Sequence, residues 1–297
     1  MLLNKPSGLT SNHSLQIIKR FFGATKAGHT GTLDPMATGL LPICLGEATK
    51  FSAMLLNADK IYHATLKLGY ISTTGDADGK IIATEHAKLS KDDLSLSRIK
   101  DVFQAFTGRI KQTPPMFSAL KFNGRPLYQY AREGEEIERK AREIIIYDLR
   151  LDSWSGNEMT IMVHCGTGTY IRTLAEDIGK ALGFGGAYLT SLCRHQIGSF
   201  NLHQAYGIDH FQGTWSAQHD TCLYTVDSLL QDFPSITLNE TESLFLLQGQ
   251  HINNKNELVL TSGTKIRLYH SNGLFLGLGE ITATGAVAPK RLISQKI

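Results

Sequence analysis

Residues 28–39 limit the local folding of this chain more than any other stretch. They read GHTGTLDPMATG and hold three glycines, three threonines and one proline. Glycine and proline interrupt regular helices and strands, so this composition predicts a shaped loop with Asp34 near its tip. Residues 40–45 follow as an apolar run, which is typical of a buried strand. The segment therefore predicts a carboxylate on a loop beside the core.

Two interpretations of Asp34 are open at this point. An Asp-Pro pair such as Asp34-Pro35 often only initiates a turn. The density of glycine and the nearby His29 instead favour a reactive site, because loops on a rigid scaffold often carry catalytic side chains. His29 does not predict a metal site, since no second ligand stands at a telling spacing, and no metal is expected.

Composition narrows the class of protein. The 297 residues are 42% hydrophobic and 19% charged, which suits a large globular domain with a smaller one. The net charge is only +3, so an RNA-binding face requires a local basic surface. The four cysteines form no Cys-x-x-Cys pair, which argues against a zinc ribbon or a disulfide scaffold. No apolar stretch reaches the length of a signal peptide or a membrane span, so we expect a cytoplasmic protein without a membrane partner.

The hydrophobic patterns predict an α+β fold. Residues 60–68 alternate between apolar and polar side chains, and Tyr62 lies on the apolar face. By this pattern alone, Tyr62 and Leu192 are ordinary core residues. Further strands are expected at residues 144–151, 159–164 and 187–197. Hairpin-like turns between strands, with helices interposed, indicate a mixed, largely antiparallel sheet with flanking helices.

The chain is expected to divide near residue 233. Residues 198–233 have little periodic signal and are interpreted as a connecting region. From residue 234 onward, short apolar pieces alternate with turns such as Asn272-Gly273, which is a strong hairpin signal. We therefore expect a large domain at residues 1–233, which would carry the active site, and a small β-rich domain at residues 234–297.

The segment at about residues 110–142 carries mixed charge. One interpretation is an ordinary solvated face. The other is an insertion that grips RNA phosphates, with Tyr128 and Tyr130 available for stacking. Four glutamates are expected to offset its basic residues in number but not in position. Between Lys121 and Arg142 the six basic residues are Lys121, Arg125, Arg132, Arg139, Lys140 and Arg142, and the glutamates are Glu133, Glu135, Glu136 and Glu138.

Arg172 lies at the start of a predicted helix. If Thr169 caps that helix, Arg172 is its third residue and opposes the helix dipole, at a cost of about 0.3–1 kcal/mol. A nearby anion would offset this cost, and Asp34 is a candidate that such a pair would keep ionised even when buried. The alternative is an ordinary i,i+4 ion pair between Arg172 and Glu176.

Residues 26–39, KAGHTGTLDPMATG, resemble the signature of the TruB family of tRNA pseudouridine synthases. No single short motif establishes this resemblance; an ordered series of matches does, and it covers nearly the whole chain. The further matches are LGEATK at 45–50, KIYHA at 60–64, LG at 68–69, DADG at 76–79, SALK at 118–121, GTYIRTL at 168–174 and VAPKRL at 287–292.

The resemblance implies an enzyme that converts uridine 55 of the tRNA T loop to pseudouridine. It implies a pseudouridine synthase fold followed by a small domain of the PUA-like kind. Asp34 would be the catalytic carboxylate and Arg172 its partner. Tyr62 would pack on the target base, Leu192 would line its pocket, and His29 would contact the rearranged T loop.

The resemblance also implies a partner and a simple assembly. The partner is the T arm of tRNA, no second protein is required, and the enzyme would act as a monomer. No cofactor is implied, because the isomerisation gains no atoms. Two features depart from the family pattern: Cys193 stands where an arginine is usual, and the chain starts directly at residues 2–6, without the longer basic lead of some relatives.

Two other functions remain as alternatives. A non-catalytic RNA-binding protein or tRNA folding chaperone on the same scaffold would not need Asp34. A hydrolase acting on a sugar or a nucleotide would need a second carboxylate, and none stands in a persuasive position. Within the synthase interpretation, Asp34 has three open routes: attack on ribose C1′, attack on the uracil ring, or assistance to an elimination.

Overall fold

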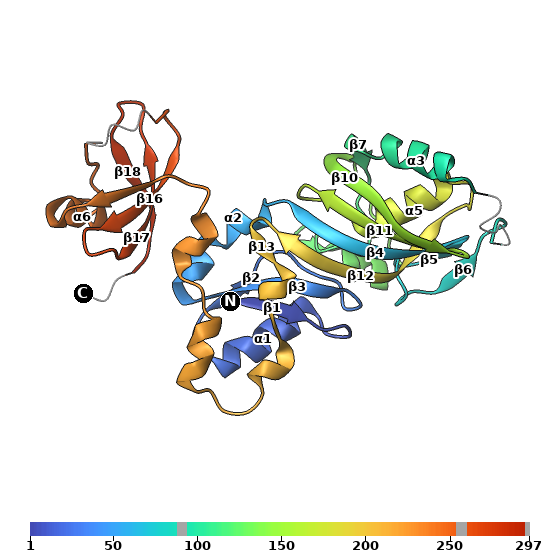
Figure 1. Cartoon of the computed structure of the whole chain (residues 1–297), viewed down its shortest axis with the longest axis horizontal. Coiled ribbons are helices and arrows are strands. Elements are labelled where there is room, and N and C mark those ends of the chain that lie inside the picture. Colours follow the sequence, from blue (N-terminus) through green and yellow to red (C-terminus); the bar gives the residue numbers. More distant parts are fainter. Residues whose placement is uncertain (88–93, 254–259, 295–297) are drawn as a thin grey trace.

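The computed structural model describes residues 1–87, 94–253 and 260–294, and it contains a large mixed sheet and a small C-terminal sheet (Figure 1). The strands of the large sheet are β1 (Leu2–Lys5), β2 (Ala27–His29), β3 (Thr38–Leu45), β4 (Lys60–Leu68), β7 (Gly108–Gln112), β10 (Arg142–Ser155), β11 (Glu158–Cys165), β12 (Ala187–Ile197), β13 (Phe200–Asn201) and β14 (Tyr206–Gly207). Their order is β14-β1-β3-β12-β4-β11-β10-β7, with β13 beside β12 and β2 beside β3. Only the β1–β14 and β3–β12 pairs within this described sheet are parallel. The predicted mixed, largely antiparallel sheet is confirmed.

Strand β12 lies between β3 and β4 and brings distant parts of the chain together. In its antiparallel pair with β4, Leu192 lies opposite Ala64 and Arg194 lies opposite Tyr62. On the other side, Arg194 lies opposite Gly39 at the start of β3. Buried residues alternate along β4, as the sequence predicts. This register places the loop before β3 next to Tyr62 and Leu192.

The predicted loop at residues 28–39 is shorter than expected. Its first two residues belong to β2 and its last two to β3, because each end pairs with a neighbouring strand. The local sequence does not reveal this pairing. Residues 30–37 lie between these strands. The buried strand predicted at residues 40–45 is confirmed as part of β3. Gly39 enters that strand with φ of 101°, a left-handed conformation that favours glycine.

Helices α3 (Leu96–Ala105) and α5 (Ile171–Ala181) contact each other, with α3 against β10 and α5 against β12 (Figure 1). Helix α1 (Ser11–Phe21) packs near β2 and β3. The predicted Thr169 cap of α5 is wrong, since Tyr170 is the N-cap residue and Arg172 is the second helical residue. The Thr169 hydroxyl instead donates to the Gly166 carbonyl at 3.0 Å.

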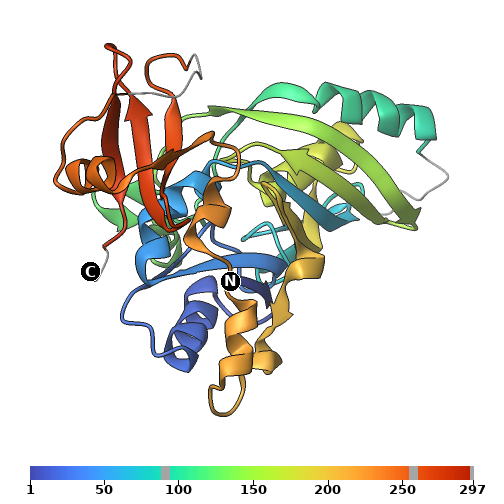
Figure 2. The ribbon, with the colours of Figure 1, turned by 60° about the vertical axis from the view of Figure 1, so that its left-hand side comes forward.

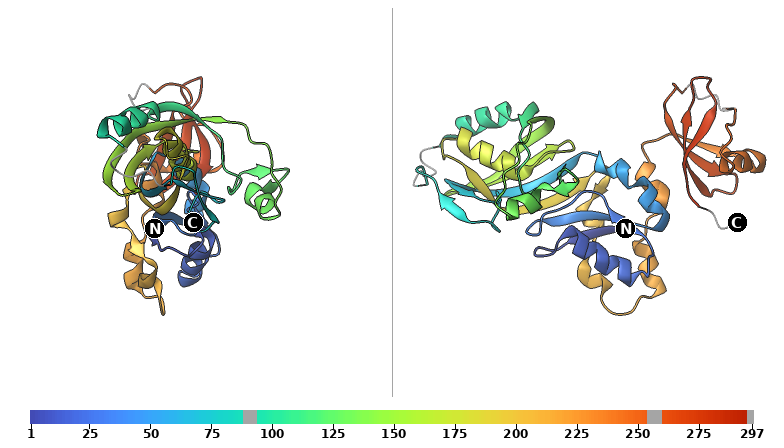
Figure 3. Two further views of the ribbon diagram at one scale, coloured as in Figure 1. Left: turned by 90° about the vertical axis from the view of Figure 1, so that its right-hand side faces the viewer. Right: turned by 180° about the vertical axis from the view of Figure 1, so that it is seen from behind.

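The segment between β7 and β10 leaves the body of the sheet. It holds β8 (Lys121–Phe122), β9 (Arg125–Pro126) and α4 (Leu127–Arg132), with a tight turn at Asn123-Gly124. Figure 3 shows this green segment extending sideways from the sheet. The remaining elements before β7 are η1 (Gly46–Phe51), α2 (Ser52–Leu56), β5 (Tyr70–Ser72) and β6 (Ile81–Ala83).

Residues 198–233 are more than a connection. They add β13 and β14 to the large sheet, and Phe211 and Cys222 are buried in its core. The short 3-10 helices of this region have no long apolar period, which explains the weak sequence signal. These helices are η3 (Leu202–Gln204), η4 (Ile208–Phe211), η5 (Ala217–Cys222) and η6 (Val226–Leu230).

The C-terminal part has its own small core. Strands β15 (Ser235–Leu238), β16 (Lys265–His270), β17 (Phe275–Ile281) and β18 (Val287–Leu292) form a sheet in that order, and α6 (Glu240–Leu247) packs beside it. The turn predicted at Asn272-Gly273 joins β16 to β17. This part contacts η1, where the Arg291 guanidinium donates to the Lys50 carbonyl at 2.7 Å and the Lys50 ammonium donates to the Leu292 carbonyl at 3.0 Å. Figure 2 shows the strands of the small sheet, coloured orange to red.

Candidate active site

Asp34 lies on the loop between β2 and β3, and buried side chains hold the residues on either side of it. The Ser11 hydroxyl accepts from the Leu33 amide at 2.8 Å and donates to the Leu33 carbonyl at 2.9 Å. The Lys5 ammonium donates to the Pro35 carbonyl at 3.2 Å. The loop closes on itself through a bond from the Ala37 amide to the Asp34 carbonyl at 3.1 Å. The carboxylate therefore projects from a backbone that is fixed on both sides.

Arg172 forms a two-point ion pair with Asp34. Its Nε lies 3.0 Å from Oδ2, and its second terminal nitrogen donates to Oδ1 at 3.3 Å. The same guanidinium donates to the carbonyls of Thr74 and Phe117, each at 2.7 Å. The alternative pair with Glu176 is wrong, because Glu176 accepts from Lys180 instead.

Asp76 is a second carboxylate that the sequence interpretation did not assign. Its Oδ2 lies 3.8 Å from the Arg172 guanidinium, and its side chain is 5% exposed. Its Oδ1 accepts from the Thr74 hydroxyl at 2.5 Å and from the Asp78 amide at 3.2 Å. The Asp-Ala-Asp-Gly run at residues 76–79 was the available signal, but it was used only as a family match, without a role for Asp76. The burial of Asp76 and its proximity to Arg172 become apparent only in the folded structure.

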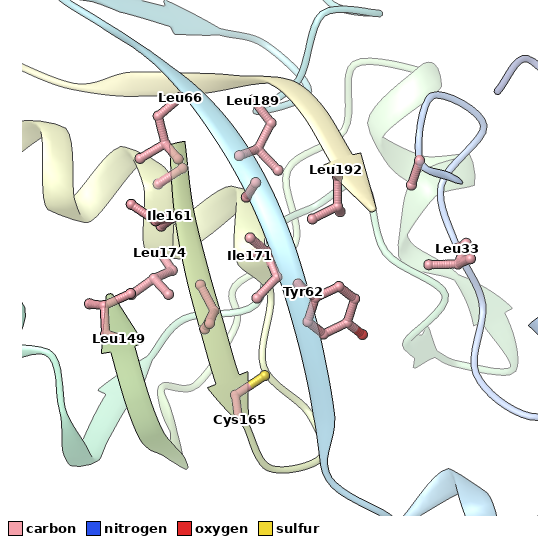
Figure 4. Packing of buried hydrophobic residues seen from close by; sticks show 14 of the residues in the cluster. Leu33, Tyr62, Leu66, Leu149, Ile161, Cys165, Ile171, Leu174, Leu189 and Leu192 are labelled. Atoms are coloured by element: carbon pink, nitrogen blue, oxygen red, sulfur yellow. The ribbon is translucent and has the colours of Figure 1, made fainter. Parts of the chain in front are cut away.

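A cleft of about 190 Å³ opens beside the Asp34–Arg172 pair. Tyr62 and Leu192 are buried in its wall, and Leu33 faces them in Figure 4. Ser118 comes from the segment after β7, so this segment also forms part of the wall. The other lining residues are Thr32, Ala119, Thr169, Tyr170 and Ile171. The cleft is smaller than the roughly 300 Å³ at which drug-sized pockets begin, so it suits a single small ring.

His29 does not line this cleft. It lies in β2 opposite Ile43, and its Nδ1 is buried without a hydrogen-bond partner in the described part of the protein. Burial lowers the pKa of the His29 imidazole, and the nearby Arg194 charge lowers it further. The structure thus brings Asp34, Tyr62, Arg172 and Leu192 together and leaves His29 apart.

Burial dominates the electrostatics of Asp34. It raises the pKa of the carboxyl above the ordinary value of 3.8; Arg172 opposes this rise, and Asp76 adds to it. The sequence predicted that the pair with Arg172 keeps Asp34 ionised even when buried; Arg172 does favour the charged form, but desolvation is the larger effect on the pKa. Burial also lowers the pKa of the Lys5 ammonium to about 8, against the opposing charge of Asp34. The pKa of the Tyr62 phenol is raised, again chiefly by burial.

Three further properties bear on the chemistry. The four cysteines are free thiols. Across residues 1–87, 94–253 and 260–294, no three His, Cys, Asp or Glu side chains gather as a metal site requires. Within the same ranges, no helix combines the length and apolar character needed to cross a membrane.

Comparison with solved structures defines the class of this fold. The structure is similar to the "Structure of H/ACA RNP bound to a substrate RNA containing 2'-deoxyuridine", with a TM-score of 0.70 and 21% identity over 99% of this chain and 85% of that one. It is also similar to the "Crystal Structure of a Cbf5-Nop10-Gar1 Complex", with a TM-score of 0.69 and 23% identity over 99% of this chain and 84% of that one. The class is that of proteins with a pseudouridine synthase fold.

Sequence relatives narrow the class to one family. A family model for TruB family pseudouridylate synthase (N terminal domain) matches residues 19–171, and one for Pseudouridine synthase II TruB, C-terminal, matches residues 234–293. The chain is 54% identical to "tRNA pseudouridine synthase B" of Nitrosomonas europaea, over 99% of this chain and 95% of that protein. It is 53% identical to the protein of the same name from Nitrosospira multiformis, over 99% of this chain and 94% of that protein. The chain belongs to the TruB family of pseudouridylate synthases and is an isomerase.

Proposed function

We propose that this enzyme converts uridine 55 in the T loop of tRNA to pseudouridine, with Asp34 as the catalytic carboxylate. The observation that carries the proposal is the two-point pair between Asp34 and Arg172 at the edge of a small cleft lined by Tyr62 and Leu192. The name shared by its relatives, "tRNA pseudouridine synthase B", supports tRNA as the substrate.

The reaction exchanges one bond for another. The bond from uracil N1 to ribose C1′ breaks, the base turns within the cleft, and a new bond joins C5 to C1′. The proton on C5 is lost and N1 gains one, so the product is an isomer and the reaction requires no oxidant or reductant. A carboxylate of raised pKa is a stronger base and a better proton acceptor than an exposed one.

Arg172 would keep the anionic form of Asp34 populated and aimed at the substrate. Its guanidinium binds both carboxylate oxygens and is itself held by two backbone carbonyls. A planar fork held at four points has little freedom to rotate, so the carboxylate is preorganised before the substrate enters.

Tyr62 and Leu192 would hold the detached base. Both side chains are buried, at 8% and 6% exposure, and both line the cleft beside Asp34. An aromatic ring and an apolar side chain exclude water, which would otherwise capture the ribose and leave an abasic product. The uridine must leave its stack to reach this cleft, at a cost of a few kcal/mol. His29 lies outside the cleft and would contact the T loop after the uridine has flipped out of it.

The insertion at residues 110–142 would bind the T arm. Two of its cations are already paired, Arg125 with Glu133 and Arg139 with Glu136. Lys121 and Lys140 are exposed and form no ion pair within the described residues, so they remain available for phosphates. The Arg125 guanidinium covers the Tyr130 ring at 4.6 Å, which leaves less of that ring for stacking than the sequence suggested.

The two parts of the chain would have different roles. Residues 1–233 would form the catalytic unit, and residues 234–297, of which 254–259 and 295–297 lie outside the described structure, would form a PUA-like unit that contacts RNA. The enzyme would act as a monomer in the cytoplasm, where tRNA is modified, without a protein partner, cofactor or metal.

Incubation of the purified protein with an unmodified T-arm minihelix tests the proposal. We expect one pseudouridine at the position of uridine 55, located by mass spectrometry after base-specific cleavage. A minihelix with cytidine at that position is the matched control and should remain unchanged. Absence of pseudouridine, or pseudouridine at another position alone, would contradict the proposal, and tight binding without turnover would favour the chaperone alternative.

A further inference from the structure

Arg194 is a buried arginine at the edge of the site that the proposed chemistry does not use. Its side chain is 1% exposed and is the largest of the fully buried side chains in the described structure. It lies on β12, opposite Tyr62 on one side and opposite Gly39 on the other. Its position therefore joins the aromatic wall of the cleft to the base of the Asp34 loop.

The guanidinium binds both ends of the loop. Its Nε donates to the Leu40 carbonyl at 2.8 Å, in β3. A terminal nitrogen donates to the Gly31 carbonyl at 3.0 Å, at the beginning of the loop. A single rigid, planar group thus links the beginning of the loop to the strand that follows it.

The backbone of the loop is built to accept this side chain. A Cβ on Gly31 would lie 3.1 Å from a terminal nitrogen of Arg194, and Gly31 has φ of 91°. A Cβ on Gly39 would clash with the Arg194 carbonyl oxygen. Two of the glycines that make the sequence motif distinctive therefore lie where the loop packs against Arg194.

Arg194 forms no ion pair with a carboxylate within residues 1–87, 94–253 and 260–294. Burial of a charge without a counter-ion is unfavourable for folding, and here hydrogen bonds to two backbone carbonyls offset part of that cost. Stability alone therefore gives a weak reason for an arginine here.

We propose that Arg194 is a positioning residue for pseudouridine formation, which fixes the Asp34 loop and the Tyr62 side chain relative to one another before the substrate enters. This inference rests on the proposed function. The positive charge of Arg194 also opposes the burial-driven rise in the pKa of the Tyr62 phenol, which links it to the aromatic wall by charge as well as by packing.

Two variants test this role, Arg194→Met and Arg194→Lys. Methionine keeps a long side chain without donors, and lysine keeps the charge but cannot bind two carbonyls with a planar fork. Lys60→Met is the matched control, because Lys60 is also a buried cation held by carbonyls, those of Leu56 and Ala58, and neither carbonyl belongs to the Asp34 loop.

Four measurements separate positioning from a structural role. For both Arg194 variants we expect the single-turnover rate to fall by about 10- to 100-fold. The Kd for the minihelix should stay within about threefold of wild type, and Tm of Arg194→Met should be unchanged or higher. Amide exchange of residues 30–37 in the free protein should accelerate by about tenfold. Lys60→Met should leave the rate and this exchange unchanged.

Other results would overturn the proposal. A wild-type rate in either folded variant removes the role, and so does unchanged exchange at residues 30–37. If the rate falls only where Tm also falls, and does so in Lys60→Met as much as in the Arg194 variants, the role of Arg194 is to stabilise the fold. If Arg194→Met does not fold, Arg194→Lys decides by the same criteria. Failure of the wild-type protein to modify any uridine would reject the proposed function, and the exchange experiment would still decide whether Arg194 fixes the loop.

Discussion

Asp34 and Arg172 are 138 residues apart in the chain, and yet they form a two-point ion pair with separations of 3.0 and 3.3 Å. The loop before β3 carries the carboxylate, and the first turn of α5 carries the guanidinium. Strand β12 joins these elements, because it pairs with β3 and packs against α5. The site therefore depends on the order of the central strands, and several consequences can be tested.

Replacement of Asp34 by asparagine should abolish pseudouridine formation and preserve the fold. The pKa of Asp34 is raised in the folded protein, so native structure disfavours its charged form at pH 7. The neutral amide removes that penalty, and Tm at pH 7 should be equal to or above that of wild type. Asp78→Asn, at an exposed position nearby, is the control and should keep its activity. Turnover by Asp34→Asn in a tritium-release assay would remove Asp34 from its role.

Replacement of Arg172 by lysine should lower kcat by about 100-fold or more, with little change in the Kd for RNA. Lysine keeps the charge but loses the planar fork that binds both oxygens of Asp34, and lost preorganisation mainly affects the transition state. Single-turnover kinetics and filter binding measure the two quantities. Lys180→Gln, on the same helix and paired with Glu176 on the exposed side, should behave as wild type. A near-normal kcat in Arg172→Lys would show that the pair is not needed.

The single-turnover rate should rise with pH along an acidic limb whose midpoint lies above 3.8, the ordinary value for aspartate. In the proposed mechanism activity requires ionised Asp34, and burial raises the pKa of that carboxyl. Asp76→Asn removes a negative charge that raises this pKa, so the limb should move to lower pH. Asp148→Asn, on β10 and paired with Arg150, should leave the limb in place. A limb that moves to higher pH in Asp76→Asn would contradict this electrostatic assignment.

Gly39→Ala should destabilise the protein by about 1–3 kcal/mol or more. Its φ of 101° disfavours an L side chain, and the new Cβ would clash with the Arg194 backbone oxygen, which cannot move freely. Gly23→Ala is the control, since φ is 58° there but no atom lies within 4 Å of the place that the new methyl group would occupy. Urea unfolding should show a clearly larger loss for Gly39→Ala, and equal losses would mean that close packing at β3 contributes nothing.

The insertion can be tested by the salt dependence of binding. Changing Lys121 and Lys140 to glutamine should weaken binding to all T-arm sequences alike and reduce the slope of log K against log salt by roughly one for each lost phosphate contact. Arg125→Gln, a cation already paired with Glu133, should change the slope less. An unchanged slope in the double variant would support the interpretation of this segment as an ordinary solvated face.

Local patterns predicted much of the fold because their signals are short in range. The alternation along residues 60–68 and the Asn272-Gly273 turn each reflect backbone geometry within a few residues, and both are present in the structure. The predicted N-cap residue of α5 was wrong by one position, because the Thr169 hydroxyl donates to the preceding Gly166 carbonyl instead. Residues 198–233 were underestimated, because short 3-10 helices leave little periodicity in the sequence.

By itself, the sequence determined which side chains are chemically available: a carboxylate on a glycine-rich loop, an arginine at a helix start, and a family membership carried by ordered motifs. Only the tertiary structure decided that Arg172 bonds Asp34 and not Glu176, and that Asp76 lies 3.8 Å from the same guanidinium. It also decided that His29 stays outside the cleft and that Arg194 donates to the carbonyls of Gly31 and Leu40. The reason is physical. The partner of a side chain and the extent of its desolvation depend on which strands, distant in the sequence, become neighbours in the sheet, and no local sequence pattern encodes that pairing.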